Sequence, residues 1–209
     1  MNLNSALSEP LVLLLTGWSS GISVYLTAAL LGICGRMGLI QLPGEMSTLS
    51  NIFVIIVALA VFAIEFVADK VPYVDSAWDS VHTFIRPLGA AAIGMMAGSD
   101  QGPVVQTIFA VLTGTLALNT HAVKASARLA INTSPEPFSN IAASFSENAL
   151  VLFMFWFFIK HPIWAALLIV LFLVLSFLFL RMMWRFVKSL FRKSAHAPHI
   201  ERPDVPPVP

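Results

Sequence analysis

Long apolar runs alternate with short polar segments along most of the chain. A helix needs about 20 mostly apolar residues to cross a bilayer, so these runs predict about six transmembrane helices. The predicted ranges are 11–33, 52–68, a segment that begins after Pro72 and ends near 98, 103–118 with an amphipathic continuation to 131, 141–159 and 163–180. We therefore expect an all-α integral membrane protein, with residues 1–190 folded as one compact bundle.

The segments that follow the apolar runs differ in charge. With both termini on the cytoplasmic side, only Arg36 and Lys160 lie outside, as expected when cytoplasmic loops carry most of the Lys and Arg. After residue 180 the segment RMMWRFVKSLFRK reads as a basic helix that lies along an anionic membrane surface. Residues 191–209 pass from basic to proline-rich and are expected to form a disordered cytoplasmic tail.

Two segments resemble each other. GISVYLT, residues 21–27, is followed by Arg36 and Pro43, and GTLALNT, residues 114–120, is followed by Arg128 and Pro135. If the two halves are related, each holds three spans and the second half inserts inverted, which gives a 3+3 inverted repeat. The alternative is a chance similarity between two helices that are rich in small residues.

Composition supports the membrane interpretation and excludes several functions. Hydrophobic residues make up 57% of the 209 residues and charged residues 11%, against about 25% charged in soluble domains. The net charge of +1 does not indicate nucleic-acid binding, and the single Cys34 excludes an internal disulfide. Nucleophile-elbow, phosphate-loop and zinc motifs are absent from the sequence, which disfavours an enzyme and predicts no cofactor beyond a divalent cation.

Charged residues gather in the stretch EFVADKVPYVDSAWDSVHTFIRP, residues 65–87, between two apolar runs. Glu65 and Asp69 are four residues apart, so they share one face of a helix. The next segment carries a second stripe at offsets of four, seven and eleven, formed by Asp75, Asp79, His82 and Arg86. Each stripe would line one side of its helix.

A third stripe and a single acid complete the set. His121, Lys124 and Arg128 share a face of the 103–131 segment, and Glu147 lies in the next apolar run. Acids and bases are nearly balanced when Lys70 is counted with the bases. A charge at membrane depth costs about 3 kcal/mol, so such side chains pair or line water. We expect one shared ionic network near the cytoplasmic face.

Each stripe also has a simpler interpretation. The acids can be ordinary ion pairs in a solvated loop, and the stripe at His121, Lys124 and Arg128 can be positive-inside anchoring. Alternatively, Asp75 and Asp79 hold a divalent cation in a membrane enzyme, while Lys124 and Arg128 hold the phosphate of a lipid substrate. A third alternative is a non-catalytic scaffold whose network only fixes helix packing.

Three segments together resemble a known family. They are GISVYLTAALLGICGRMGLI near the N-terminus, the charged stretch at 65–87, and THAVKASARLAINTSPEPFSN at 120–140. In them the chain resembles the bacterial integral-membrane domain-of-unknown-function family 4126. This resemblance implies a location in the bacterial cytoplasmic membrane and implies no activity.

The favoured function is that of a small transporter or channel-like protein that moves an ion or small solute through the charged network. The predicted binding residues are Glu65, Asp69, Asp79, His82, Arg86, His121, Lys124, Arg128 and Glu147, with Asp75 and Asp79 as the candidate metal ligands. The expected partners are the lipid bilayer and the transported ion or solute, without nucleic acid. A homodimer would help a chain of this length to bury its polar faces.

Overall fold

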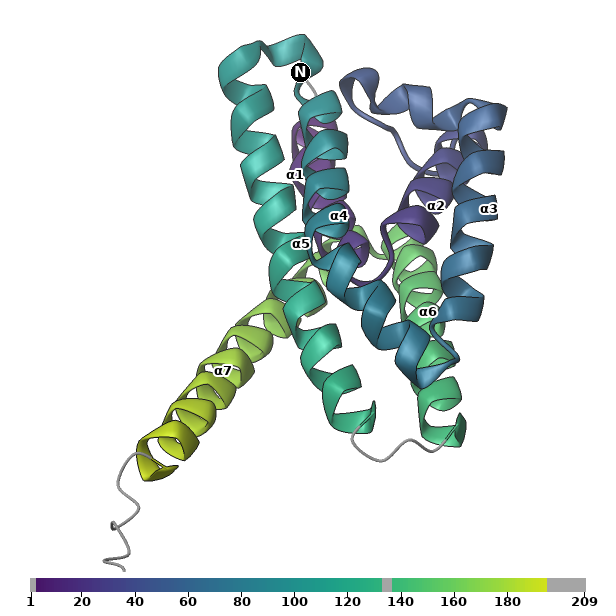
Figure 1. Ribbon diagram of the computed structural model, residues 1–209. Coiled ribbons are helices and arrows are strands. Elements are labelled where there is room, and N and C mark those ends of the chain that lie inside the picture. The colour runs from purple at the N-terminus through teal and green to yellow at the C-terminus, as the bar shows by residue number, and fades with distance from the viewer. Residues whose placement is uncertain (1–2, 133–136, 195–209) are drawn as a thin grey trace, which may run out of the picture.

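The computed structural model describes residues 3–132 and 137–194, and all regular elements in these ranges are helical. They are, in chain order, α1 (Leu3–Ile22), α2 (Val24–Arg36), η1 (Gly44–Ser50), α3 (Ile52–Ala68), α4 (Pro72–Ala97), η2 (Ser99–Gln101), α5 (Pro103–Asn132), α6 (Pro137–Lys160) and α7 (Pro162–Ser194). The structure confirms an all-α bundle (Figure 1). Most of the predicted tail, residues 195–209, lies outside the described residues.

Helices α1, α4 and α5 pack closely because glycines replace larger side chains where they meet (Figure 1). A Cβ on Gly21 of α1 would lie 2.5 Å from both the Ala117 carbonyl oxygen and the Thr120 Cβ of α5. Small residues permit such close approach of helices in membranes. Thr113 of α5 adds a hydrogen bond of 2.9 Å to the Ala90 carbonyl of α4.

The first predicted span is wrong as a single helix. Ser23 has an extended backbone, with φ −152° and ψ 112°, and separates α1 from α2. The two helices form a V whose arms open toward the upper end in Figure 1. The Ser23 hydroxyl caps α2 by accepting a hydrogen bond from the Leu26 N–H at 3.2 Å. Hydropathy does not record this break, because the run stays apolar across it.

Helices α3 and α4 then lead the chain down and back up the bundle. The Asn51 side chain caps α3 at the Phe53 N–H, and η1 meets α3 at an angle of 72°. Pro72 occupies the first turn of α4, where its missing N–H disrupts no helical hydrogen bond. The α3 bounds match the predicted range, and α4 matches the predicted third segment within one residue at its C-terminal end.

Helices α6 and α7 complete the bundle. Helix α6 starts at Pro137, four residues before the predicted segment 141–159 begins. Helix α7 runs without a break to Ser194 and points away from the bundle (Figure 1). The predicted basic helix is therefore the end of α7 rather than a separate surface helix, and it extends into the predicted tail.

The length and composition of the helices support a membrane protein. Three described helices, α5, α6 and α7, are long and apolar enough to span a membrane, and the bent pair of η1 and α3 makes up to four. About six spans are therefore not confirmed, and neither is the inverted repeat. Helix α1 begins near the upper end of the bundle and α7 ends near the lower end (Figure 1). This path does not support the expectation that both termini are cytoplasmic.

Replacing Gly21 by Val should loosen the contact between α1 and α5. Overpacking a core costs about 1–3 kcal/mol, and each 1 kcal/mol lowers the Tm of a chain of this size by about 2–4 °C. We expect the thermal unfolding temperature of the purified protein in detergent to fall by several degrees. The control is Ala60→Val on the exposed face of α3, for which we expect no change. Equal unfolding temperatures for the two variants would contradict this packing.

Candidate functional site: a buried ionic network

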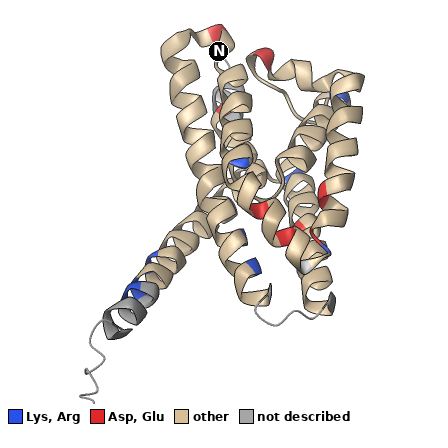
Figure 2. Ribbon diagram, viewed as in Figure 1, with Lys and Arg blue, Asp and Glu red and all other residues tan. Residues whose placement is uncertain are grey.

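Charged side chains from four helices meet where α3 ends and α4 begins, which we call the network end of the bundle. Figure 2 shows acidic and basic positions gathered in this part of the molecule. The ion pairs connect eight residues, which we call the ionic network: Glu65, Asp69, Asp75, Asp79, Arg86, Lys124, Arg128 and Glu147. Seven of them are buried, and the Glu147 side chain is 19% exposed.

Arg86 joins α3 to α4. Its guanidinium is fully buried, with Nη2 2.9 Å from Glu65 Oε1 and Nη1 2.9 Å from Asp79 Oδ1. Nη1 is also 2.6 Å from His121 Nδ1 on α5. Two carboxylates thus compensate the cost of burying one cation, and the arrangement fixes three helices around one side chain.

Lys124 lies at the centre of three carboxylates. Its Nζ is 3.2 Å from Asp69 Oδ2, 3.4 Å from Glu147 Oε2 and 3.9 Å from Asp79 Oδ1. It also donates a hydrogen bond of 3.3 Å to the Ile22 carbonyl, the last residue of α1. A cation near a helix C-terminus is favourable, because the carbonyl end of the helix dipole is negative.

Arg128 joins α5 to α6 and α3. Nε and Nη2 donate to the two oxygens of Glu147, at 2.9 and 2.7 Å, in a bidentate pair. Nη1 donates to Asn140 Oδ1 at 2.7 Å and to the Asp69 carbonyl at 3.3 Å, and lies 3.9 Å from Asp75 Oδ1. The Asn140 amide also donates to the Asp69 carbonyl, so the open C-terminal end of α3 has partners.

The break at Ser23 faces Glu65. The Ser23 hydroxyl donates a hydrogen bond to Glu65 Oε2, while Arg86 holds the other oxygen of this carboxylate. Glu65 therefore lies beside the N-terminus of α2, where the helix dipole favours negative charge. The C-terminus of α1 thus faces a cation, Lys124, and the N-terminus of α2 faces an anion, Glu65.

The two histidines have different roles. Because arginine only donates hydrogen bonds, His121 Nδ1 accepts from Arg86 and the ring carries its proton on Nε2, facing Thr83 Oγ1 at 3.0 Å. His82 stacks on the Trp78 ring, with centroids 4.4 Å apart, and lies within hydrogen-bond distance of the Tyr25 hydroxyl at 3.1 Å. His82 thus belongs to an aromatic group beside the ionic network rather than to its ion pairs.

Acids outnumber bases in the network. Five carboxylates pair with three cationic side chains. Lys70, which the sequence led us to count among the bases, instead lies over the Phe66 ring, 2.9 Å from its centroid. Desolvation lowers the pKa of this ammonium, which lies between α3 and α4. The expected near balance of charge is therefore wrong, and the network is acidic.

The arrangement does not favour the metal hypothesis. Asp75 lies near Arg128, and Asp79 lies near Arg86 and Lys124, so each carboxylate of the proposed metal pair faces a basic side chain. Within residues 3–132 and 137–194, no group of three or more His, Cys, Asp or Glu side chains is arranged to hold a metal ion. The lipid-phosphate enzyme thus lacks a supporting observation.

The predicted stripes meet in space, whereas their function as a binding site stays a prediction. The simpler interpretation of the α5 stripe as membrane anchoring does not fit, since His121, Lys124 and Arg128 are all buried. Sequence reasoning missed Ser23 and Asn140. Asn140 is seven residues before Glu147 and so shares its helical face, which was a usable signal. Ser23 carried no comparable signal, because its partner is 42 residues away.

The fold and the network define an all-helical integral membrane protein with a buried, acidic ionic network. The chain belongs to the family described as a domain of unknown function (DUF4126), whose model matches residues 11–182. The predicted resemblance is thereby confirmed. Neither the curated proteins nor the solved structures contain a match.

Replacing Arg86 by Met should destabilise the protein strongly. Removing one partner of a buried ion pair costs about 3–5 kcal/mol, because it leaves buried carboxylates without their cation. We expect little monodisperse protein after detergent extraction and a lower unfolding temperature. The double variant Glu65→Gln and Arg86→Met should recover part of the loss.

Arg185→Met, on the exposed end of α7, is the matched control and should behave like the wild type. If Arg86→Met and Arg185→Met unfold at the same temperature, the network does not stabilise the fold.

Proposed function

We propose that this protein is a small membrane transporter or channel-like protein that moves an ion or a small solute past its ionic network. The observation that carries this proposal is the broken helix. In membrane transporters, substrate sites are often formed by discontinuous helices whose N-termini face anionic groups and whose C-terminal carbonyls face cations. The V of α1 and α2 has this form, with Glu65 at the start of α2 and Lys124 at the end of α1.

The acidic character of the network supports an ion as the moving species. Two more carboxylates than cations, in a site screened from water, are costly unless protons or cations neutralise them. A network built only for helix packing has no need for this excess. The hypothesis of a non-catalytic scaffold therefore explains the ion pairs but not the excess of carboxylates in the ionic network.

The distribution of basic residues supports a cytoplasmic network end. Lys70 lies there, and Arg181, Arg185 and Lys188 lie on the half of α7 that extends past the bundle in the same direction (Figure 2). Glu9, Glu45 and Asp100 lie at the opposite end. Under the positive-inside rule, the network end then faces the cytoplasm of a bacterial inner membrane. We also propose that the protein forms a homodimer. Measuring the molecular mass of the purified protein in detergent tests this.

Reconstituted protein should make liposomes permeable to at least one small ion or solute, and Glu65→Gln should remove this flux. The change deletes one charge beside the helix break and keeps the shape of the side chain. The control is Glu45→Gln, an exposed acid at the opposite end, which should keep the flux of the wild type. If wild type and Glu65→Gln both leave every tested ion and solute impermeant, the transport proposal loses its support.

Replacing Ser23 by Ala should slow transport while leaving the fold intact. The change removes the N-cap of α2 and the hydrogen bond to Glu65. A hydrogen bond to a charged group contributes about 1.5–3 kcal/mol, so we expect flux to fall about tenfold. The control is Ser47→Ala in η1, whose hydroxyl bonds only locally at the opposite end. Equal flux for both variants would show that the helix break has no part in transport.

A further inference from the structure

A groove lies on the outer side of the contact between α4 and α5. It has a volume of about 210 Å³, which is room for several water molecules, since each occupies about 30 Å³ in the liquid. Its lining is polar on the α4 side, where it includes Ser76, Asp79, Ser80 and Thr83. Arg128 and Leu129 lie on the α5 side.

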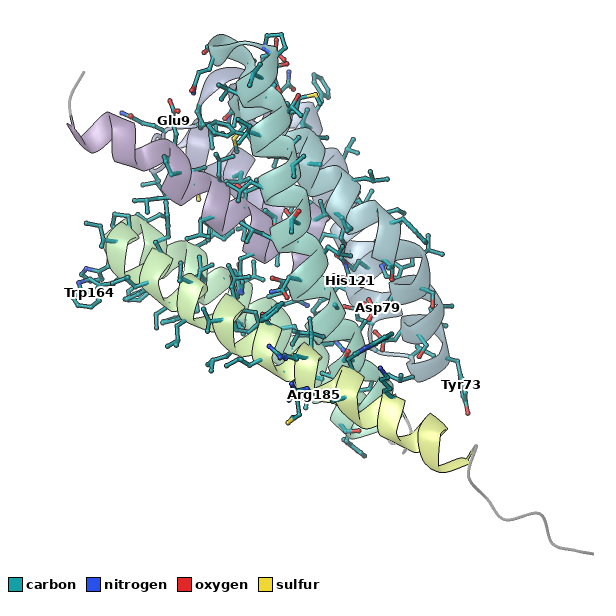
Figure 3. The ribbon with its side chains drawn as sticks, turned by 90° about the vertical axis from the view of Figure 1, so that its left-hand side faces the viewer. Glu9, Tyr73, Asp79, His121, Trp164 and Arg185 are labelled. Atoms are coloured by element: carbon teal, nitrogen blue, oxygen red, sulfur yellow. The ribbon has the colours of Figure 1, made fainter. Side chains whose placement is uncertain are left out.

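One network carboxylate that lines this groove has a buried oxygen without a hydrogen-bond partner. Asp79 is 5% exposed, and its Oδ1 lies 2.9 Å from Arg86 Nη1 and 3.9 Å from Lys124 Nζ. Its Oδ2 has no hydrogen-bond partner among the described residues. Figure 3 shows Asp79 near His121, between α4 and α5 and well inside from Tyr73 at the start of α4. A buried carboxylate oxygen without a donor is costly, which makes it the natural contact for an entering cation.

The basic residue of the groove is already engaged. Arg128 directs Nε and Nη2 to Glu147 and Nη1 to Asn140 and the Asp69 carbonyl. All three nitrogens of its guanidinium thus already donate to oxygens of the protein. The hydroxyl of Ser80 donates to the Ser76 carbonyl at 2.8 Å, which leaves its lone pairs as acceptors. The groove thus offers oxygen acceptors and favours positive charge.

We propose that this groove is the route by which a small monovalent cation, a proton or an alkali ion, reaches Asp79 from the network end. One carboxylate with neutral hydroxyl oxygens suits a single positive charge, whereas divalent ions take more carboxylate ligands. The inference rests on the proposed function, because it names the class of ion and its point of entry. Thr83 links the groove to His121 of the bundle interior, since its hydroxyl lies 3.0 Å from His121 Nε2.

The test measures thiol reactivity and needs no transport. Cys34 is replaced by Ala and Ser80 by Cys, and the protein in nanodiscs is treated with cationic or anionic methanethiosulfonate reagents. A negative groove attracts the cationic reagent, so we expect it to react about tenfold or more faster than the anionic one. Adding Asp79→Asn should remove most of this preference. Ser47→Cys, at the opposite end, serves as the control position and should keep its reagent ratio when Asp79 is changed.

The identity of the cation is tested by whether it protects the cysteine of Ser80→Cys from modification. Slower modification of Ser80→Cys in sodium or potassium than in an equal concentration of a bulky organic cation, at fixed pH, identifies an alkali ion. A cationic preference that disappears at acidic pH without alkali protection identifies a proton. Equal rates for the two reagents, or a preference that survives Asp79→Asn, would overturn the proposed route.

These outcomes are separate from those of the flux assay. A liposome flux that depends on Glu65, together with an unselective groove, would refute the route and leave the transporter standing. A selective groove in a protein that transports nothing would leave a cation site without transport.

Discussion

The structure depends on the burial of Arg86. A guanidinium without water needs compensating charge, and here Glu65 of α3 and Asp79 of its own helix supply it at 2.9 Å each. His121 of α5 accepts a further hydrogen bond. The position of α3 against α4 and α5 therefore follows from one cation, since moving any of these helices would leave a buried charge without a partner. The glycine contacts of α1 with α5 then bring the break at Ser23 to the same place.

Helix ends add fixed partial charges to the network. Lys124 lies at the C-terminal carbonyl of α1, Glu65 at the start of α2, and Arg128 at the C-terminal carbonyl of α3. Each partial charge is small, but it cannot diffuse or titrate, and a site screened from water strengthens it. The network thus combines ionisable side chains with immobile dipoles. This combination distinguishes it from a surface ion cluster of the same composition.

Periodicity in the sequence was enough to predict the helical class, the bounds of α3 and the three charged stripes. Offsets of three, four and seven place side chains on one face whatever the helix packs against, so Asp75, Asp79 and Arg86 could be grouped by their spacing alone. The break at Ser23 could not be predicted in this way. It depends on a contact with Glu65, which lies on another helix and has no fixed sequence spacing to Ser23. Lys70 was misassigned for a different reason: spacing places it beside Phe66, four residues earlier, but does not tell whether a lysine pairs with an acid or lies over a ring.

Pro87 divides α4 into two parts with different neighbours. Above it, small residues hold the helix tightly against α5, and below it lie Asp75, Asp79 and Arg86. Proline removes one backbone hydrogen bond, so α4 bends most easily there, and Figure 1 shows the helix changing direction along its length. A swing of the lower part would move Asp79 and Arg86 together, while Glu65 stays in place on α3. Such a hinge would separate Arg86 from Glu65 without disturbing the glycine-packed half of the bundle.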